Sequence, residues 1–169
     1  MAKNLGTICL IDQSPRNFSD EDKDLLTDLA RMVEHEIMAM QLATMDELTM
    51  ISNKRGFESL ARRALSLCKR MDTLASLIFI DLDKFKSIND RFGYAEDDRA
   101  LQTFSQMLRD TFRDYDIIGR IGGDEFAVLQ LNSSGLDCEL SLKRLNNRVS
   151  AYNAIASKEY DIEFSAGFC

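Results

Sequence analysis

The stretch "GRIGGDEFAVL", residues 119–129, sets two glycines and two carboxylates between runs that are typical of β-strands. Gly122 and Gly123 predict a tight hairpin turn, because glycine alone adopts positive φ angles without steric cost. Asp124 and Glu125 follow this turn directly, although a solvated hairpin does not need two adjacent carboxylates. The rest of the sequence has to indicate what this negative charge serves.

The composition sets the first limits. The chain has 169 residues, of which 45% are hydrophobic, and a formal net charge of −7. This length is enough for one hydrophobic core with a second small element. The net charge argues against nucleic acid or a membrane as the main partner, because both favour a basic surface. A nucleotide ligand stays compatible with an acidic chain, since metal ions and backbone amides can neutralise its phosphates.

Cysteine usage and hydropathy predict a cytoplasmic chain. No CxxC pair is present, which favours free thiols in a reducing compartment over a metal or redox site. The N-terminal apolar run is too short for a signal peptide, and no later run reaches membrane-spanning length. The single histidine, His35, lies among charged residues, so no histidine-based catalysis is expected. The cysteines are Cys9, Cys68, Cys138 and Cys169.

The N-terminal part predicts a strand at residues 5–12 and one long helix at 18–45. Ser19 is a candidate N-cap, with Asp22 three residues later in a capping-box pattern. Apolar residues recur along this helix in a heptad pattern that Glu36 interrupts. Both a coiled coil and an amphipathic helix packed on its own domain are compatible with this pattern. The heptad residues are Leu26, Leu29, Val33, Met40 and Ala43.

From Asn53 onward the hydrophobic pattern alternates between helices and strands. Together these elements have the order β-α-β-β-α-β, so we expect an α+β domain with a ferredoxin-like core behind an N-terminal signalling helix. Such a sheet brings the end of its first strand beside the central hairpin. The expected ranges are a helix at 53–71, a strand at 74–82, a helix at 97–112, strands at 116–121 and 126–131, a helix around 142–149 and a strand at 161–168.

Carboxylates also end the first of these strands. In "FIDLDKFK", Asp81 and Asp83 point to the same face because side chains alternate along a strand. If the strand pairs with the hairpin, Asp81 approaches Asp124 and Glu125, and such groups repel one another unless a cation lies between them. A hard divalent cation, Mg²⁺ or Mn²⁺, takes oxygen ligands of this kind. The alternative is that these are strand-end carboxylates facing water.

Several motifs in a fixed order resemble the GGDEF domain of diguanylate cyclases, over residues 46–169. The resemblance implies that two GTP molecules condense to cyclic di-GMP with loss of two pyrophosphates. It also implies a homodimer, because each domain binds one GTP. The motifs are "DELT" at 46–49, "NKRGF" at 53–57, "FIDLDKFKSINDRFG" at 79–93, "DD" at 97–98 and "RIGGDEF" at 120–126.

The resemblance also assigns roles to individual residues. Asp81, the Leu82 carbonyl, Asp124 and Glu125 would hold the metal ion, and Asp124 is also a candidate general base. The remaining roles concern GTP itself. Lys86 would neutralise phosphate charge, Asn89 and Asp98 would bind the guanine edge, Tyr94 stands where a histidine is usual, and Gly122 and Gly123 would let the backbone approach the triphosphate.

A second motif, "RDYD" at 113–116, matches the RxxD pattern that many members of this family use as an inhibitory product site. Arg113 can bind phosphate or guanine in a fork geometry, and Asp116 can accept hydrogen bonds from guanine. The resemblance therefore implies that cyclic di-GMP is an inhibitor as well as the product. A surface ion pair is the alternative for this motif.

Two further comparisons with known families concern the ends of the chain. Residues 1–45 resemble the end of a GAF-type sensor domain followed by a signalling helix. The chain is expected to stop before a closing segment that supplies a lysine and an arginine to the triphosphate.

Departures from the usual pattern of the family occur at Met50–Ser52, Tyr94 and Asp97. A non-catalytic module that binds cyclic di-GMP or GTP is the alternative function.

Overall fold

The computed structural model describes residues 6–7, 9, 11, 17–156 and 159–169. It divides the chain into two compact units, Met1–Ala43 and Thr44–Cys169. The strand predicted at residues 5–12 falls mostly outside the described residues. None of the helices in the described part of the chain is both long and apolar enough to cross a membrane.

Helix α1, Asp20–Thr44, confirms the predicted long helix and its start. The backbone amide of Ser19 donates to Asp22 Oδ2 at 2.9 Å, and the amide of Asp22 donates to Ser19 Oγ at 3.1 Å. These reciprocal bonds satisfy amides that the first helical turn leaves without partners. Of the heptad residues, Leu29, Val33 and Met40 are 45–60% exposed.

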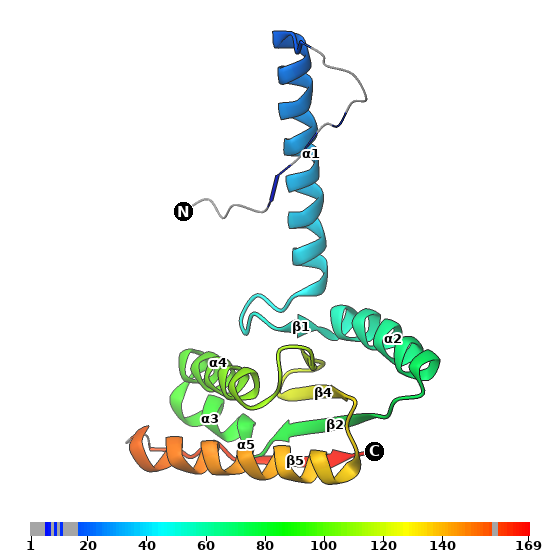
Figure 1. Ribbon diagram of the computed structural model, residues 1–169. Helices are drawn as coiled ribbons and strands as arrows, with labels where there is room; N and C mark the ends of the chain where they lie inside the picture. The colour runs from blue at the N-terminus through cyan, green and yellow to red at the C-terminus, as the bar shows by residue number, and fades with distance from the viewer. Residues whose placement is uncertain (1–5, 8, 10, 12–16, 157–158) are drawn as a thin grey trace. The chain divides into compact units, whose positions relative to one another are not determined.

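The second unit is built on a five-stranded sheet with the order β1-β3-β4-β2-β5 (Figure 1). Strand β1 pairs in parallel with β3, and the other neighbours are antiparallel. The order β3-β4-β2-β5 is that of the predicted ferredoxin-like core, to which β1 adds an edge. The strands are β1 (Ser52–Asn53), β2 (Ala75–Leu82), β3 (Ile117–Arg120), β4 (Glu125–Leu131) and β5 (Phe164–Phe168).

Helices cover the two faces of this sheet unequally. Helices α4 (Tyr94–Thr111) and α5 (Gly135–Ala156) pack over the main core, where Phe104 is fully buried with its ring 5.2 Å from that of Phe126. Helix α2 (Lys54–Met71) covers β3 and β4 on the opposite face, where Phe57 packs against Ala127 and Leu129. Successive buried residues of β4 join opposite clusters, with Phe126 and Val128 in the main core and Ala127 and Leu129 against Phe57, because side chains alternate between the two faces of a strand.

The connection between β2 and α4 differs from the prediction. The structure has an additional helix, α3 (Phe85–Phe92), and α4 begins three residues before the expected position 97. Gly93 separates the two helices with a φ of 82°, a left-handed conformation that favours glycine. The short helix escaped the sequence analysis because eight residues give too few turns for a clear period.

Candidate active site

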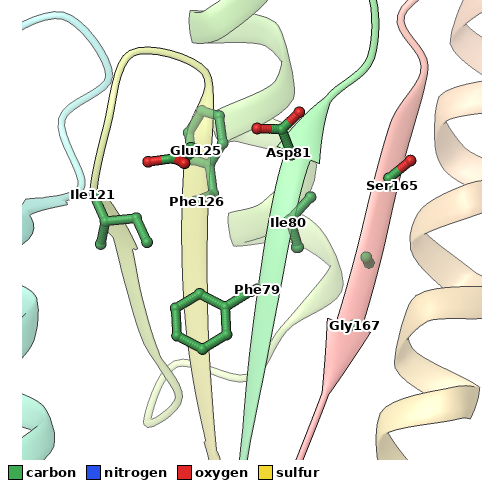
Figure 2. A pocket seen from close by; sticks show the side chains of 9 residues that line it. Phe79, Ile80, Asp81, Ile121, Glu125, Phe126, Ser165 and Gly167 are labelled. Atoms are coloured by element: carbon green, nitrogen blue, oxygen red, sulfur yellow. The ribbon is translucent and has the colours of Figure 1, made fainter.

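The end of β2 and the β3–β4 hairpin meet at one end of the sheet, as the sequence predicts. Asp81 lies opposite Glu125 in the antiparallel register, and the amide of Leu82 donates to the carbonyl of Asp124 at 3.2 Å. Figure 2 shows Asp81 and Glu125 at the same end of their neighbouring strands. The fold therefore brings Asp81 to the pair Asp124 and Glu125, which follow it by more than forty residues in the sequence.

The turn itself is built differently from the prediction. The positive-φ glycines among the described residues are Gly6 and Gly93, so Gly122 and Gly123 do not use a left-handed backbone. A Cβ on Gly122 would meet the carboxylate and stem of Glu125, with the Cδ atom 3.1 Å away. A Cβ on Gly123 would point into open space. A side chain at Gly122 would therefore displace the Glu125 carboxylate, whereas a side chain at Gly123 would meet no protein atom.

Repulsion between the carboxylates changes their acidity. Burial raises the pKa of Asp81, and the charges of Asp124 and Asp83 raise it further. Burial likewise raises the pKa of Asp97, with contributions from Asp98 and Asp124 that Arg120 partly opposes. Asp97 is 8% exposed, and its Oδ1 atom has no hydrogen-bond partner in the described part of the chain. The site therefore has more negative charge than its own cations balance.

Arg120 holds the hairpin turn in place, a role that the sequence analysis missed. Its Nε and Nη2 atoms donate to the Gly123 carbonyl at 2.9 and 2.7 Å, and its Nη1 atom lies 3.3 Å from the Asp46 carboxylate. Burial raises the pKa of Asp46, but hydrogen bonds from Thr49 and the charge of Arg120 outweigh it and lower the pKa overall. The signal was present, because Asp46 and Arg120 belong to two of the quoted motifs.

The predicted nucleotide-binding side chains lie on α3 and α4. Lys86 and Asn89 are on α3, while Tyr94 is the first residue of α4 and Asp98 follows just after its first turn. Lys86, Tyr94 and Asp98 are exposed, and Asn89 is half-buried. None of these four side chains makes a hydrogen bond or ion pair to another described residue. Their polar atoms are thus available for a ligand, and the helices bring them to the side of the sheet where β2 ends.

The donor atoms at this end of the sheet fit a magnesium ion only as a partial site. In the described residues, no three His, Cys, Asp or Glu side chains converge closely enough to hold a metal ion. Magnesium in nucleotide enzymes is often held by one or two carboxylates together with substrate phosphates. Asp81 and Asp124 match this requirement in number and chemistry.

A cavity of about 280 Å³ adjoins the carboxylates on the face of the sheet (Figure 2). Asp81, Glu125 and Ser165 are its polar lining residues, and the half-exposed side chain of Phe79 is part of its apolar lining. The cavity thus has an apolar part next to the acidic ends of β2 and β4. Its lining is Phe79, Ile80, Asp81, Ile121, Glu125, Phe126, Ser165, Ala166 and Gly167.

The RDYD motif forms a separate turn between α4 and β3. The Asp116 carboxylate accepts hydrogen bonds from the amides of Arg113 at 3.0 Å and Leu131 at 3.2 Å, and the residue is 8% exposed. Arg113 is exposed and donates to the hydroxyl of Tyr115 at 2.7 Å. The motif therefore pairs a fixed carboxylate with an exposed guanidinium.

This turn lines a cavity of about 410 Å³ at the C-terminal end of α4. Leu60 from α2 and Arg109 from α4 also line it, and the sequence analysis named neither. Arg109 donates to the Thr49 carbonyl at 2.8 Å, and its Nε and Nη2 atoms donate to Gln106 Oε1, so its guanidinium is held in place. Arg109 is in the last turn of α4 and Arg113 lies beyond the end of that helix, so no sequence period links the two residues.

Comparisons with known proteins identify the family to which the chain belongs. A family model described as "Diguanylate cyclase, GGDEF domain" matches residues 43–169. The chain is 31% identical to the probable diguanylate cyclase DgcC of Escherichia coli over 81% of this chain and 37% of that protein. It is 34% identical to the diguanylate cyclase DgcS of Shewanella oneidensis over 75% of this chain and 43% of that protein. The chain thus spans less than half the length of these relatives.

Solved structures agree with the fold. The coiled coil and GGDEF domain of DgcB from Caulobacter crescentus, in complex with cyclic di-GMP, matches with a TM-score of 0.78 at 24% identity, over 86% of this chain and 78% of that chain. The GGDEF domain of TpbB from Pseudomonas aeruginosa matches with a TM-score of 0.67 at 32% identity, over 73% of each chain. The family match begins at residue 43, so the segment that resembles a GAF domain has no counterpart in it.

Proposed function

Because the chain belongs to the diguanylate cyclase GGDEF domain family, we propose that it forms part of an enzyme that condenses two GTP molecules to cyclic di-GMP and two pyrophosphates. The observation that carries this proposal is the pairing of Asp81 with the Asp124–Glu125 end of the hairpin. Burial and mutual repulsion raise the pKa of Asp81 there, which is the electrostatic signature of a site that needs a cation. A solvated hairpin would not gather this charge.

Within this proposal, Asp81, the Leu82 carbonyl, Asp124 and Glu125 are the candidate ligands of Mg²⁺ or Mn²⁺. When bound, the metal ion would supply charge neutralisation at the phosphates of GTP. Asp124 is also the candidate general base that would accept the proton of the attacking 3′-hydroxyl group. The Arg120 bonds to Gly123 keep the turn, and hence Asp124, in a fixed position before substrate arrives.

The unpaired polar groups of α3 and α4 are the candidate GTP contacts. Asn89 and Asp98 offer an amide and a carboxylate that can accept the N–H groups of a guanine edge. Lys86 offers a cation for the phosphates, and Gly123, where a Cβ would point into open space, leaves room for a close ligand. Tyr94 is 79% exposed and lies beside Gly93, where it can cover the base.

Catalysis by this mechanism needs two copies of the domain, because each GTP is attacked by the other. We propose a homodimer in which the exposed apolar residues of α1 pair as a coiled coil. Glu36 interrupts the seam, so association should be weak and concentration-dependent. Light scattering over a range of protein concentrations checks this, and a strictly monomeric chain at high concentration would contradict it.

The second cavity is the candidate product site. Arg113 projects from a turn that Asp116 holds rigid, and Arg109 lines the same cavity. Two guanidinium groups beside a cavity of about 410 Å³ suit the phosphates and guanine edges of cyclic di-GMP. Product bound here would inhibit without occupying the GTP site, because the motif lies at the opposite end of β3 from the hairpin turn.

The role proposed for the N-terminal unit rests on fewer observations. We propose that residues 1–45 end a GAF-like sensor and that α1 transmits its signal to the domain at 46–169. The capping box and the length of α1 agree with this role. Free thiols at all four cysteines agree with a cytoplasmic location, which the substrate GTP also requires.

The decisive experiment is incubation with GTP and Mg²⁺, with product identified by mass spectrometry. We expect cyclic di-GMP and two pyrophosphates for each product molecule, and neither product when EDTA replaces Mg²⁺. A protein that binds GTP or cyclic di-GMP but forms no product would instead be a non-catalytic signalling module. The intact hairpin carboxylates favour the enzyme over that alternative.

A further inference from the structure

Helix α2 carries a concentration of positive charge that the acidic net charge conceals. The chain as a whole has 21 Lys and Arg against 28 Asp and Glu. In the 18 residues of α2 the balance is reversed, and Glu58 is the one acid in the helix. Asp72 follows it at the C-cap. The cations of α2 are Lys54, Arg55, Arg62, Arg63, Lys69 and Arg70.

These cations face away from the sheet. The buried residues of α2 are Gly56, Phe57 and Cys68, whereas all six cations are exposed. Arg55, Arg62 and Lys69 recur every seven residues, which places them in one line along the outer side of the helix. No ion pair to another described residue involves any of the six cations. Their charge is therefore not neutralised within the described part of the domain.

Exposed apolar side chains lie near the C-terminal end of α2. Leu65 is one turn from Lys69 and flanks the basic line, whereas Leu67 and Met71 lie across the helix from that line. Leu65 and Leu67 are 47% and 43% exposed, and Met71 and Leu74 are 62% and 68% exposed. Single exposed apolar residues are common, but here four lie within ten residues of one another beside Lys69 and Arg70. Figure 1 shows α2 at the margin of the 44–169 unit, apart from α3, α4 and α5.

We infer that the outer side of α2 is a docking surface for an anionic lipid bilayer. Lysine and arginine near such a surface each contribute to binding through the negative headgroups, and exposed leucine and methionine can enter the boundary between headgroups and acyl chains. The overall charge of −7 does not prevent this, because charges farther than about 8 Å from the surface are largely screened at physiological salt. A basic helix in an acidic domain also fixes which side of the domain turns toward the bilayer.

A nucleic acid would suit this surface less well. Phosphates would pair with the same cations, but the outer side of α2 has no aromatic residue to stack on bases. The exposed apolar side chains would then face a hydrophilic backbone without gain. A bilayer uses both kinds of side chain, so the observations favour lipid.

Vesicle co-sedimentation of the 169-residue chain tests this inference. Vesicles of phosphatidylcholine with about 30% phosphatidylglycerol should bind the protein, and pure phosphatidylcholine vesicles should not. The double variant Arg62→Gln/Lys69→Gln should bind the anionic vesicles about 30-fold more weakly, since each cation near the surface contributes about a fivefold gain. Raising the salt to about 0.5 M should release most of the wild-type protein.

The matched control is Lys143→Gln/Arg144→Gln, which removes the same charge from exposed positions on α5. This control should bind anionic vesicles as the wild type does, and thermal melts should show that both double variants are folded. Absence of binding to anionic vesicles, or equal losses in the two double variants, would overturn the inference. Binding to a DNA duplex in preference to the vesicles would overturn it as well.

Discussion

The two turns that flank β3 use aspartate in opposite ways. Before the strand, the Asp116 carboxylate accepts two backbone amides and is almost fully buried. After the strand, Asp124 stands beside Asp81 and Asp97, and burial and mutual repulsion raise the pKa of both these neighbours. The first carboxylate stabilises its own turn, whereas the second group has charge left for something that the chain does not supply. Substitutions should therefore affect stability at one turn and activity at the other.

The largest effect should come from Asp81→Asn, which removes a charge from the proposed metal site. We expect Mg²⁺-dependent turnover of GTP to fall by at least about 100-fold, the scale seen when one electrostatic contact to a transition state is lost. Stability should not fall, because the substitution relieves repulsion. The matched control is Asp83→Asn, which removes the same charge but keeps an oxygen that can accept the hydrogen bond from the Ser165 hydroxyl. Turnover near the wild-type rate in Asp81→Asn would refute its role.

Asp116→Ala should show the reverse pattern. It leaves the amides of Arg113 and Leu131 without their buried acceptor, at a cost of about 2–4 kcal/mol in the free energy of unfolding. Asp116→Asn keeps one acceptor oxygen and should cost less. Urea denaturation of the two variants measures the difference. Unchanged midpoints in both would show that the turn does not depend on this carboxylate.

Arg113→Ala should leave the turn intact, because the bonds that Asp116 accepts come from backbone amides. The loss of one charge-assisted contact of about 1.5–3 kcal/mol should weaken cyclic di-GMP binding by roughly ten- to a hundred-fold. Initial turnover of GTP should stay nearly unchanged while product inhibition disappears. Calorimetric titration of cyclic di-GMP into parent and variant is the test. Equal affinities would reduce RDYD to a structural turn.

The smallest effect should be a pH-dependent one at Asp97. Its folded-state pKa is raised above the ordinary 3.8, so the ionised group destabilises the fold at neutral pH. Asp97→Asn should therefore raise the free energy of unfolding near pH 7 by about 1 kcal/mol, which is measured as a higher melting temperature. The advantage should shrink as the pH falls through the raised pKa and vanish below 3.8, where both states bind the proton. A pH-independent difference would contradict this cause.

Much of the fold was predictable because its strands and longer helices carry clear periods. The spacing of apolar residues predicts strand β2, the β3–β4 hairpin and helix α4. The order of the elements predicts that Asp81 and Glu125 pair. Helix α3 was missed because it is short. The backbone of the hairpin turn was predicted wrongly, since glycine identity indicates freedom and not the conformation adopted. The close approach of the Glu125 side chain to Gly122 is a contact that only the structure shows.

The site was predictable as a set of residue types and less so as a set of interactions. Sequence spacing located the carboxylates, but not the Arg120 clamp on Gly123, because that bond depends on the turn geometry. It also located Asp116 without indicating that two amides already hold its oxygens. The net charge was the least informative sequence property for locating charged surfaces, because it averages the basic helix α2 with the acidic rest of the chain.

The most direct test of the central claim is the Mg²⁺ dependence of GTP binding, measured by calorimetry on the wild type and on Asp81→Asn. This measurement does not require turnover. We predict that Mg²⁺ strengthens GTP binding to the wild type by at least about tenfold, equivalent to 1.4 kcal/mol, and that Asp81→Asn abolishes this gain. Equal GTP affinity in Mg²⁺ and in EDTA would show that the carboxylates at the end of β2 and β4 do not serve a cation.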